Sequence, residues 1–178
     1  MRLFVALELP PPVVATLEQW ARGAARDGLR LLPPESLHVT LAFLGERPDE
    51  EAEAIEEATR GAAASAGTVP ALSLAAPAWL PPRRPGVLAV DLTDDGACAR
   101  LQGTVAEALV ALGVYTPEKR AFRPHVTVAR VRKGARVDKE VPPIPDAGTF
   151  AATALTLYRS RLSPKGARYD ALARTPLT

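Results

Sequence analysis

The amino-acid sequence predicts a fold of mixed strands and helices, arranged as two related lobes. Strand-like and helix-like segments alternate along the chain, and one order (a strand, a long helix, then a second strand) occurs twice. Both units end in nearly the same pentapeptide, HVTLA at 38–42 and HVTVA at 125–129. The only two histidines of the chain, His38 and His125, lie in these pentapeptides. A pattern that repeats at this scale predicts two pseudo-symmetric halves.

The first half of the chain contains two predicted strands and two predicted helices. Apolar residues alternate over 2–9, which is typical of a strand, and the prolines at 10–12 end it. Apolar residues then recur at helical spacing up to a stop near Gly28: Val13, Leu17, Trp20 and Ala24. Residues 36–45 form a β-branched, apolar strand candidate, and the acidic stretch 47–64 predicts a helix with Pro48 near its start.

The second half contains one predicted helix among five predicted strands. Asp94 is a candidate cap for this helix, and Gly113 is a candidate stop. Its apolar residues keep helical spacing, which makes Cys98 a core residue: Cys98, Leu101, Val105, Leu109 and Leu112. The predicted strands are 71–80, 86–92, 124–131, 153–162 and 167–173, with turns at 81–86 and at SPKG (163–166) and a long loop at 132–149.

Length and composition exclude several classes of protein. A chain of 178 residues fits one two-lobed domain over 1–178, and 47% hydrophobic with 24% charged residues is ordinary for a globular protein. The single Cys98 excludes an internal disulfide and suits a reducing cytosol. The apolar N-terminus is too short for a signal peptide, and no apolar run approaches membrane-spanning length, so we expect a cytoplasmic protein. No P-loop, GxGxxG or GxSxG motif occurs.

Positive charge is concentrated around the second histidine. Residues 119–136 carry seven basic residues and no acid, whereas the other 15 basic residues face 20 acids, a net −5. Such a zone indicates an anionic ligand near His125. A solvated charged surface is the alternative interpretation.

Strand geometry places the histidine and the threonine of each motif on one face. Alternate side chains of a strand share a face, so His38 and Thr40 point together, as do His125 and Thr127. The intervening apolar residues are expected in the core. Phe43 has the parity of these core residues, so core packing is favoured over stacking on a nucleobase.

Two facing histidines form an acid–base pair for phosphate chemistry. One neutral imidazole removes a proton from the nucleophile, and one charged imidazole protonates the leaving oxygen. Threonine hydroxyls can stabilise the phosphate oxygens. A zinc or iron site is the alternative, but no carboxylate lies two or four residues after either histidine, and threonine is a poor ligand. We therefore expect neither a metal nor a cofactor.

The motifs resemble those of a known family. HVTL and HVTV are similar to the H-x-T-x motifs of the two-histidine phosphoesterase superfamily. With RLFVALELP, HVTLAFLGE, RPHVTVAR and LYRSRLSPKGARYDALARTPL, the chain more closely resembles the bacterial and archaeal RNA 2′,3′-cyclic phosphodiesterases, the 2′-5′ RNA ligase family. This resemblance implies a bilobal α+β fold, with a pseudo-two-fold pair of antiparallel-rich sheets lining a central cleft and helices outside.

The resemblance also implies a reaction and roles for the motif residues. The reaction is metal-independent hydrolysis of RNA or nucleoside 2′,3′-cyclic phosphates to 2′-phosphomonoesters, with ATP-independent 2′-5′ ligation as its reverse. His125 is the implied proton acceptor and His38 the proton donor, while Thr40 and Thr127 bind the phosphate. The implied partners are RNA 3′ ends or nucleoside cyclic phosphates, with no membrane and a monomeric state as the default. The alternative is a non-catalytic module that binds nucleotides or RNA ends.

Two arginines and one loop are further candidates for substrate binding. Arg123 shares the face of His125, although the intervening Pro124 can bend the chain. Arg130 has the opposite parity, so it would reach the phosphate only through a bulge or around the strand edge. The 132–149 loop, with Lys133 and Arg136, could guide an RNA strand or close over the site, or it could be an ordinary surface loop.

Overall fold

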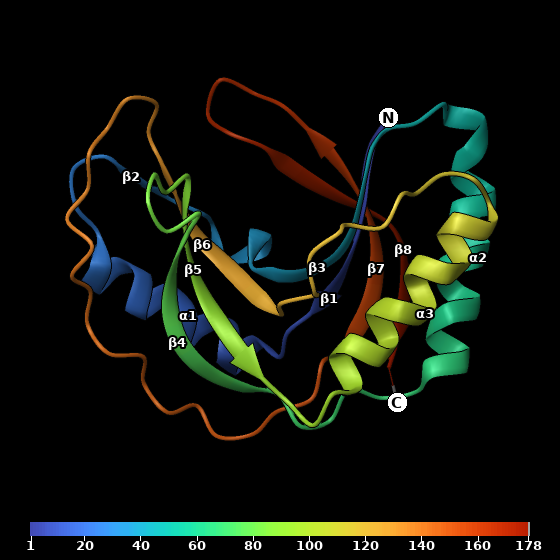
Figure 1. The fold of residues 1–178 in the computed structure, drawn as a ribbon, viewed down its shortest axis with the longest axis horizontal. Coiled ribbons are helices and arrows are strands. Elements are labelled where there is room, and N and C mark those ends of the chain that lie inside the picture. Colours follow the sequence, from blue (N-terminus) through green and yellow to red (C-terminus); the bar gives the residue numbers. More distant parts are fainter. Residues whose placement is uncertain (178) are drawn as a thin grey trace.

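One antiparallel sheet of eight strands forms the centre of the molecule (Figure 1). The computed structural model describes residues 1–177. The strand order is β4-β5-β6-β3-β1-β7-β8, and β2 pairs with β6 off this path. The strands are β1 (Arg2–Glu8), β2 (Leu29–Leu31), β3 (His38–Glu46), β4 (Ser73–Leu80), β5 (Val87–Thr93), β6 (His125–Val131), β7 (Ala154–Arg161) and β8 (Arg168–Pro176). The helices are α1 (Pro11–Ala24), α2 (Ala52–Ala66) and α3 (Ala97–Ala111), with short 3₁₀ turns at Pro34–Ser36 and Asp49–Glu51.

The sheet consists of two halves that share a single residue pair. Strands β3 and β6, which carry the two histidine motifs, are in register only at Val39 and Val126. Beyond this point they diverge, and β6 pairs instead with the three-residue strand β2. The two expected sheets are thus the halves β3-β1-β7-β8 and β4-β5-β6-β2 of one divided sheet. Strand β2 was not predicted, because three residues are too few for an alternating pattern.

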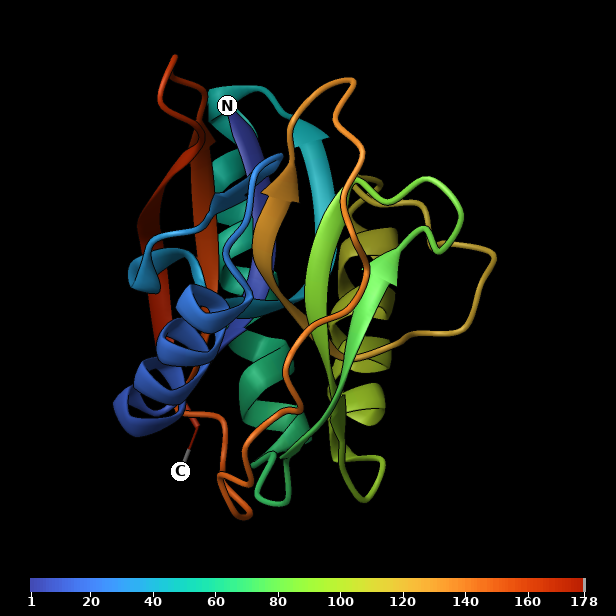
Figure 2. The ribbon, with the colours of Figure 1, turned by 90° about the vertical axis from the view of Figure 1, so that its left-hand side faces the viewer.

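The helices lie on the outside of the two halves, as predicted (Figures 1 and 2). Helix α1 follows β1 but packs behind β6 in the other half, whereas α3 follows β5 but packs behind β3. Helix α2 packs against α3, β7 and β8. Because α1 and α3 each cross to the opposite half, these two helices interlock the halves.

The apolar stripes predicted for two helices are the buried faces of those helices. Burial confirms Val13, Leu17, Trp20 and Ala24 in α1, and Cys98, Leu101, Val105 and Leu109 in α3. The Asp94 carboxylate accepts a hydrogen bond from the Cys98 backbone at 2.6 Å and so pairs a donor of the first turn, although the N-cap residue of α3 is Gly96. The prediction was wrong for Leu112, which is exposed. Helix α3 already ends at Ala111, and Gly113 adopts a positive φ of 73° there.

The long loop at 132–149 is fixed to the body of the protein by both tryptophans. Trp20 Nε1 donates to the carbonyl of Pro142, and Trp79 Nε1 donates to the carbonyl of Lys139, each at 3.0 Å. Val137, Val141 and Ile144 pack against the core. Among residues 1–177, no helix has the length and apolarity needed to cross a membrane.

Candidate active site

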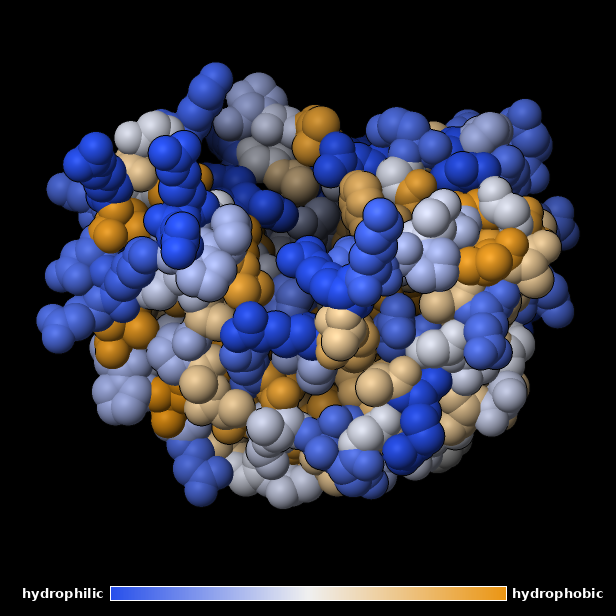
Figure 3. Space-filling model, in the orientation of Figure 1, coloured by the Kyte–Doolittle hydropathy of each residue, from blue (hydrophilic) through white to orange (hydrophobic). Residues whose placement is uncertain are grey.

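Both histidine motifs open into one pocket of about 390 Å³ between the two halves of the sheet. His38 and Thr40 enter it from β3, and His125 and Thr127 enter it from β6. The surface is hollowed at this position near the β7–β8 hairpin, with hydrophilic residues around the opening (Figure 3). The two copies of the motif therefore form one site, as the sequence predicted.

A β-bulge follows the threonine in each motif. In β3, Thr40 pairs with Ala6 and Ala42 pairs with Val5, so Leu41 is the extra residue. In β6, Thr127 pairs with Ala89 and Ala129 pairs with Leu88, so Val128 is the extra residue. Each bulge shifts the alternation by one position for the residues that follow.

Both bulged residues have their carbonyl groups bonded from outside the strand pair. The carbonyl of Leu41 accepts a hydrogen bond from Gln102 Nε2 of α3 at 3.3 Å. The carbonyl of Val128 accepts one from the backbone of Leu32, just after β2, at 2.9 Å. These bonds satisfy polar groups that the ladder leaves unpaired, and they favour the bulged conformations.

The bulges change which side chains reach the pocket. Phe43 was expected in the core, but it is 49% exposed and lines the pocket, because the bulge at Leu41 places it on the face of His38. Arg130 lines the pocket for the same reason, so the bulge that its parity required is present at Val128. Residues 38–43 and residues 125–130 share one burial pattern, in which Phe43 and Arg130 occupy equivalent positions.

The pseudo-symmetry also includes the neighbouring strands. Thr40 lies opposite Ala6 on β1, and Thr127 lies opposite Ala89 on β5. The residues opposite His38 and His125 are both acidic, Glu8 and Asp91. This short A-x-(E/D) repeat could have been found in the sequence, but only once β1 and β5 were known to be the partners of the motif strands.

An arginine neutralises each of these two acidic residues. Arg174 donates to Glu8 at 2.8 Å, and Thr156 donates to the same carboxylate at 2.6 Å. Burial by itself would raise the pKa of Glu8, but the hydrogen bonds from Thr156 and Arg174 lower it overall. Arg123 forms a bidentate pair with Asp91, with contacts of 2.8 and 2.6 Å.

The pair with Asp91 corrects the role expected for Arg123. Its guanidinium is bonded to a carboxylate and does not line the pocket, so it is not placed to bind substrate. Its backbone carbonyl instead lies 2.7 Å from Nδ1 of His125. Because a carbonyl only accepts, Nδ1 carries the proton, and Nε2 of a neutral His125 is free to accept one.

Three aromatic side chains surround the ring of His38. Phe4 stacks on it with centroids 5.0 Å apart, Tyr158 stacks at 5.8 Å, and Tyr169 meets it edge-on at 5.4 Å. Burial, with the positive charge of Arg130 as the next cause, lowers the pKa of His38 from 6.5 to about 4. His38 is therefore neutral at pH 7 in the free protein.

Two arginines that the sequence did not single out also line the pocket. Arg2 extends from β1 over the ring of Phe43, with its guanidinium carbon 4.9 Å from the ring centroid. Arg30 lies on β2 beside Arg130. Of the seven basic residues at 119–136, only Arg130 lines the pocket, so that zone is largely a solvated surface.

The 132–149 loop is not part of the site. None of its described residues lines the pocket, because the loop runs over the half that contains β4 and β5 and is held there by the tryptophans. Within residues 1–177, no group of three or more His, Cys, Asp or Glu side chains is arranged to hold a metal ion.

These features define a bilobal α+β protein in which two H-x-T-x strands face a common basic pocket. The chain belongs to the 2′-5′ RNA ligase superfamily, whose family model matches residues 9–163. It is 30% identical to an RNA 2′,3′-cyclic phosphodiesterase of Thermus thermophilus over 99% of this chain and 90% of that one.

Two crystal structures have the same fold over nearly the whole chain. TT0787 of Thermus thermophilus is 31% identical, with a TM-score of 0.82 over 99% of this chain and 98% of that one. LigT of Escherichia coli complexed with 3′-AMP is 26% identical, with a TM-score of 0.76 over the same shares of the two chains.

Proposed function

We propose that this protein is an RNA 2′,3′-cyclic phosphodiesterase, which hydrolyses the cyclic phosphate to a 2′-phosphomonoester without a metal ion. The observation that carries the proposal is the convergence of His38, Thr40, His125 and Thr127 on one pocket. The activity named for the Thermus thermophilus relative and the 3′-AMP bound to E. coli LigT support it.

His125 is the proposed proton acceptor. Its Nδ1–H donates to the Arg123 carbonyl, so its Nε2 can take a proton from a water molecule that attacks the phosphorus atom. A new P–O bond forms as the P–O3′ bond breaks. His38 gives its proton to the departing O3′, and the product keeps its phosphate on O2′.

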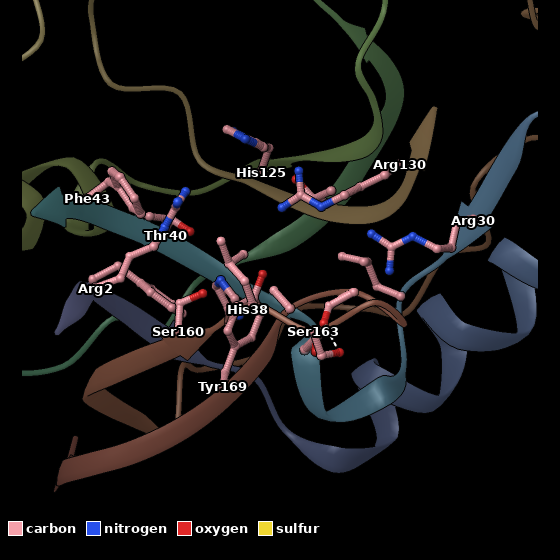
Figure 4. A pocket seen from close by; sticks show the side chains of 17 residues that line it. Arg2, Arg30, His38, Thr40, Phe43, His125, Arg130, Ser160, Ser163 and Tyr169 are labelled. Atoms are coloured by element: carbon pink, nitrogen blue, oxygen red, sulfur yellow. Dashed lines mark hydrogen bonds between the residues drawn. The ribbon is translucent and has the colours of Figure 1, made fainter. Parts of the chain in front are cut away.

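Three further side chains are placed to stabilise the charge that develops on phosphorus. Thr40 and Thr127 offer hydroxyl donors from the same strand faces as the two histidines. Arg130 adds a guanidinium that can bind two non-bridging oxygens, and it points into the space between the histidines (Figure 4). The two lobes thus provide equivalent histidine and threonine groups, while the arginine comes from the second motif alone.

The donor role of His38 requires a bound phosphate. A pKa of about 4 leaves this imidazole neutral in the free protein at pH 7. A phosphate anion in the pocket opposes the charge of Arg130 and favours the imidazolium. The acid is therefore formed when substrate binds.

The terminal nucleobase has a candidate stacking surface at one end of the pocket. Phe43 is half-exposed there, beside the histidines, and the Arg2 guanidinium lies over the ring. Aromatic rings of this kind stack on bases with little sequence preference. ATP-independent 2′-5′ ligation would use the same groups: a 5′-hydroxyl replaces water as the nucleophile at His125, and O3′ departs with the proton of His38.

The activity is tested with an oligoribonucleotide that ends in a 2′,3′-cyclic phosphate. Wild type should convert it to the 2′-phosphate with or without EDTA, while His38→Ala and His125→Ala should each lose roughly 10²- to 10⁴-fold in rate. Binding without turnover would instead identify a non-catalytic module. Activity that disappears in EDTA would exclude the metal-free mechanism. A 3′-phosphate product would show that O2′, and not O3′, is the leaving oxygen.

Location and oligomeric state complete the proposal. A cytoplasmic location is proposed because a chain with the single Cys98 forms no internal disulfide and suits a reducing compartment. A monomer is the expected state, and size-exclusion chromatography with light scattering tests it.

A further inference from the structure

Two arginines lie side by side on the wall of the pocket. Arg30 of β2 is the direct cross-strand partner of Arg130 of β6, and both line the pocket. Directly opposed residues of an antiparallel pair have Cβ atoms about 5 Å apart, and like charges in such a pair are destabilising. A second bound anion would relieve this repulsion.

No carboxylate neutralises either of these arginines within the part of the chain that the structure describes. Arg30 Nη1 donates to the carbonyl of Lys165 in the β7–β8 turn, at a long 3.3 Å. The backbone of Gly166 packs directly against the guanidinium, where any side chain would overlap it. The turn thus holds Arg30 in the pocket wall, but it provides a neutral acceptor in place of an anion.

The pocket has a direction along which these groups are ordered. Phe43 and Arg2 lie at one end, the histidines lie in the middle, and Arg30 lies beyond Arg130 at the other end (Figure 4). In a nucleoside 2′,3′-cyclic phosphate, the base is attached to C1′, which neighbours C2′, and C5′ is attached to C4′, which neighbours C3′. The base and the 5′ oxygen therefore extend to opposite sides of the cyclic phosphate. With the base at Phe43, the 5′ oxygen is directed towards Arg30.

We propose that Arg30 binds the phosphate on the 5′ oxygen of the terminal nucleotide, which in RNA is the phosphodiester that joins this nucleotide to the chain. The inference rests on the proposed function, because it places the reacting phosphate between His38 and His125. It distinguishes two phosphate positions, one at Arg130 for the reacting group and one at Arg30 for the group that does not react. The enzyme accordingly prefers cyclic phosphates on a chain to free nucleoside cyclic phosphates.

The test compares two substrates that differ by one phosphate. The first is adenosine 2′,3′-cyclic phosphate, and the second carries a methyl phosphate diester on O5′, which mimics the chain linkage without a second base. Wild type should favour the second substrate roughly 10- to 100-fold in kcat/KM, the range of a hydrogen bond to a charged group. Arg30→Gln should bring this ratio close to one, and Arg30→Lys should retain part of it because the charge remains.

Arg84→Gln is the matched control. Arg84 is an exposed arginine in the β4–β5 turn and does not line the pocket, so its loss should leave the substrate ratio unchanged. A wild-type ratio near one would overturn the proposal. An equal loss on both substrates in Arg30→Gln would also overturn it, since Arg30 would then act on the reacting phosphate. So would an equal fall of the ratio in Arg84→Gln, which would reflect net charge alone.

A binding measurement separates this proposal from the proposed function. Calorimetry compares the Kd of adenosine 2′-phosphate with that of the same product carrying the 5′ methyl phosphate diester. Tighter binding of the second product by wild type, lost in Arg30→Gln, would support the second phosphate position even if neither cyclic substrate were hydrolysed. Equal Kd values for the two products would refute it even if both substrates were hydrolysed.

Discussion

The imidazole of His38 should titrate far below the ordinary range of histidine in the free protein. Burial and then the charge of Arg130 lower its pKa from 6.5 to about 4. At 1.36 kcal/mol per pKa unit, this shift means that the folded protein disfavours the charged form of the ring by about 3 kcal/mol. Arg130→Gln removes the charge but not the burial, so it should raise the pKa only in part.

Binding of a phosphate should restore the charge on His38. A unit negative charge about 4 Å away, at an effective dielectric constant of 20, contributes about 4 kcal/mol, or about 3 pKa units. The pKa of His38 then rises towards neutrality, which suits a general acid near neutral pH. Binding at pH 6 to 7 should therefore take up a proton.

NMR titration of the imidazole ring protons measures the pKa of His38 in the free protein and in the complex, because the chain contains only two histidines. His125→Gln assigns the signals, and the titration is repeated with saturating adenosine 2′-phosphate. Calorimetry in buffers of different ionisation enthalpy counts the proton. A pKa of 6.5 or higher for His38 in the free protein would refute the electrostatic reasoning. An unchanged pKa in the complex would exclude His38 as an acid generated by binding.

The same shift predicts the pH dependence of stability. The folded state lowers the pKa of His38, so at acidic pH the unfolded chain takes up a proton that the folded protein excludes. Protonation of His38 therefore leaves the free energy of unfolding unchanged above pH 6.5 and lowers it as the pH falls towards 4. His38→Gln should remove this loss in urea unfolding measured at pH 7 and pH 4. An equal acid loss in the variant would assign it to other groups.

Three further substitutions test the site and its support. Phe43→Ala should weaken binding of oligonucleotide substrates by roughly 1–3 kcal/mol in KM, through lost stacking; an unchanged KM would exclude the base from this surface. Asp91→Asn breaks the exposed ion pair with Arg123, so it should cost less than about 1 kcal/mol of stability. The same change should lower kcat, because the Arg123 carbonyl positions His125, and wild-type kcat would show that the backbone suffices. Leu155→Ala, at a fully buried position of β7, should cost roughly 2–5 kcal/mol in urea unfolding, and a smaller loss would mean that the core closes around the cavity.

Local pattern in the sequence identified most of the elements and the catalytic candidates. The spacing of apolar residues determined the buried faces of α1 and α3, because a helix presents the same face every 3.6 residues wherever it packs. The repeated H-x-T pattern placed each histidine beside its threonine by strand alternation alone. Prolines and glycines marked the ends of most elements for equally local reasons.

Strand alternation failed at Phe43 and was insufficient for Arg130. Both positions depend on bulges at Leu41 and Val128, and a bulge is defined by the register with a partner strand. The groups that satisfy the bulge carbonyls, Gln102 and the backbone of Leu32, are distant in sequence. No local pattern reports such a register.

The sequence by itself predicted the groups proposed for catalysis: two histidines, each with a threonine on the same face of a strand. The tertiary structure alone decided which charges join them. It directed Arg123 to Asp91 and away from the pocket, and it brought Arg2 and Arg30 into the pocket from strands whose sequences do not indicate a binding site. The physical reason is that periodicity records only which side of an element faces the core. The contents of a pocket depend on how separate elements meet.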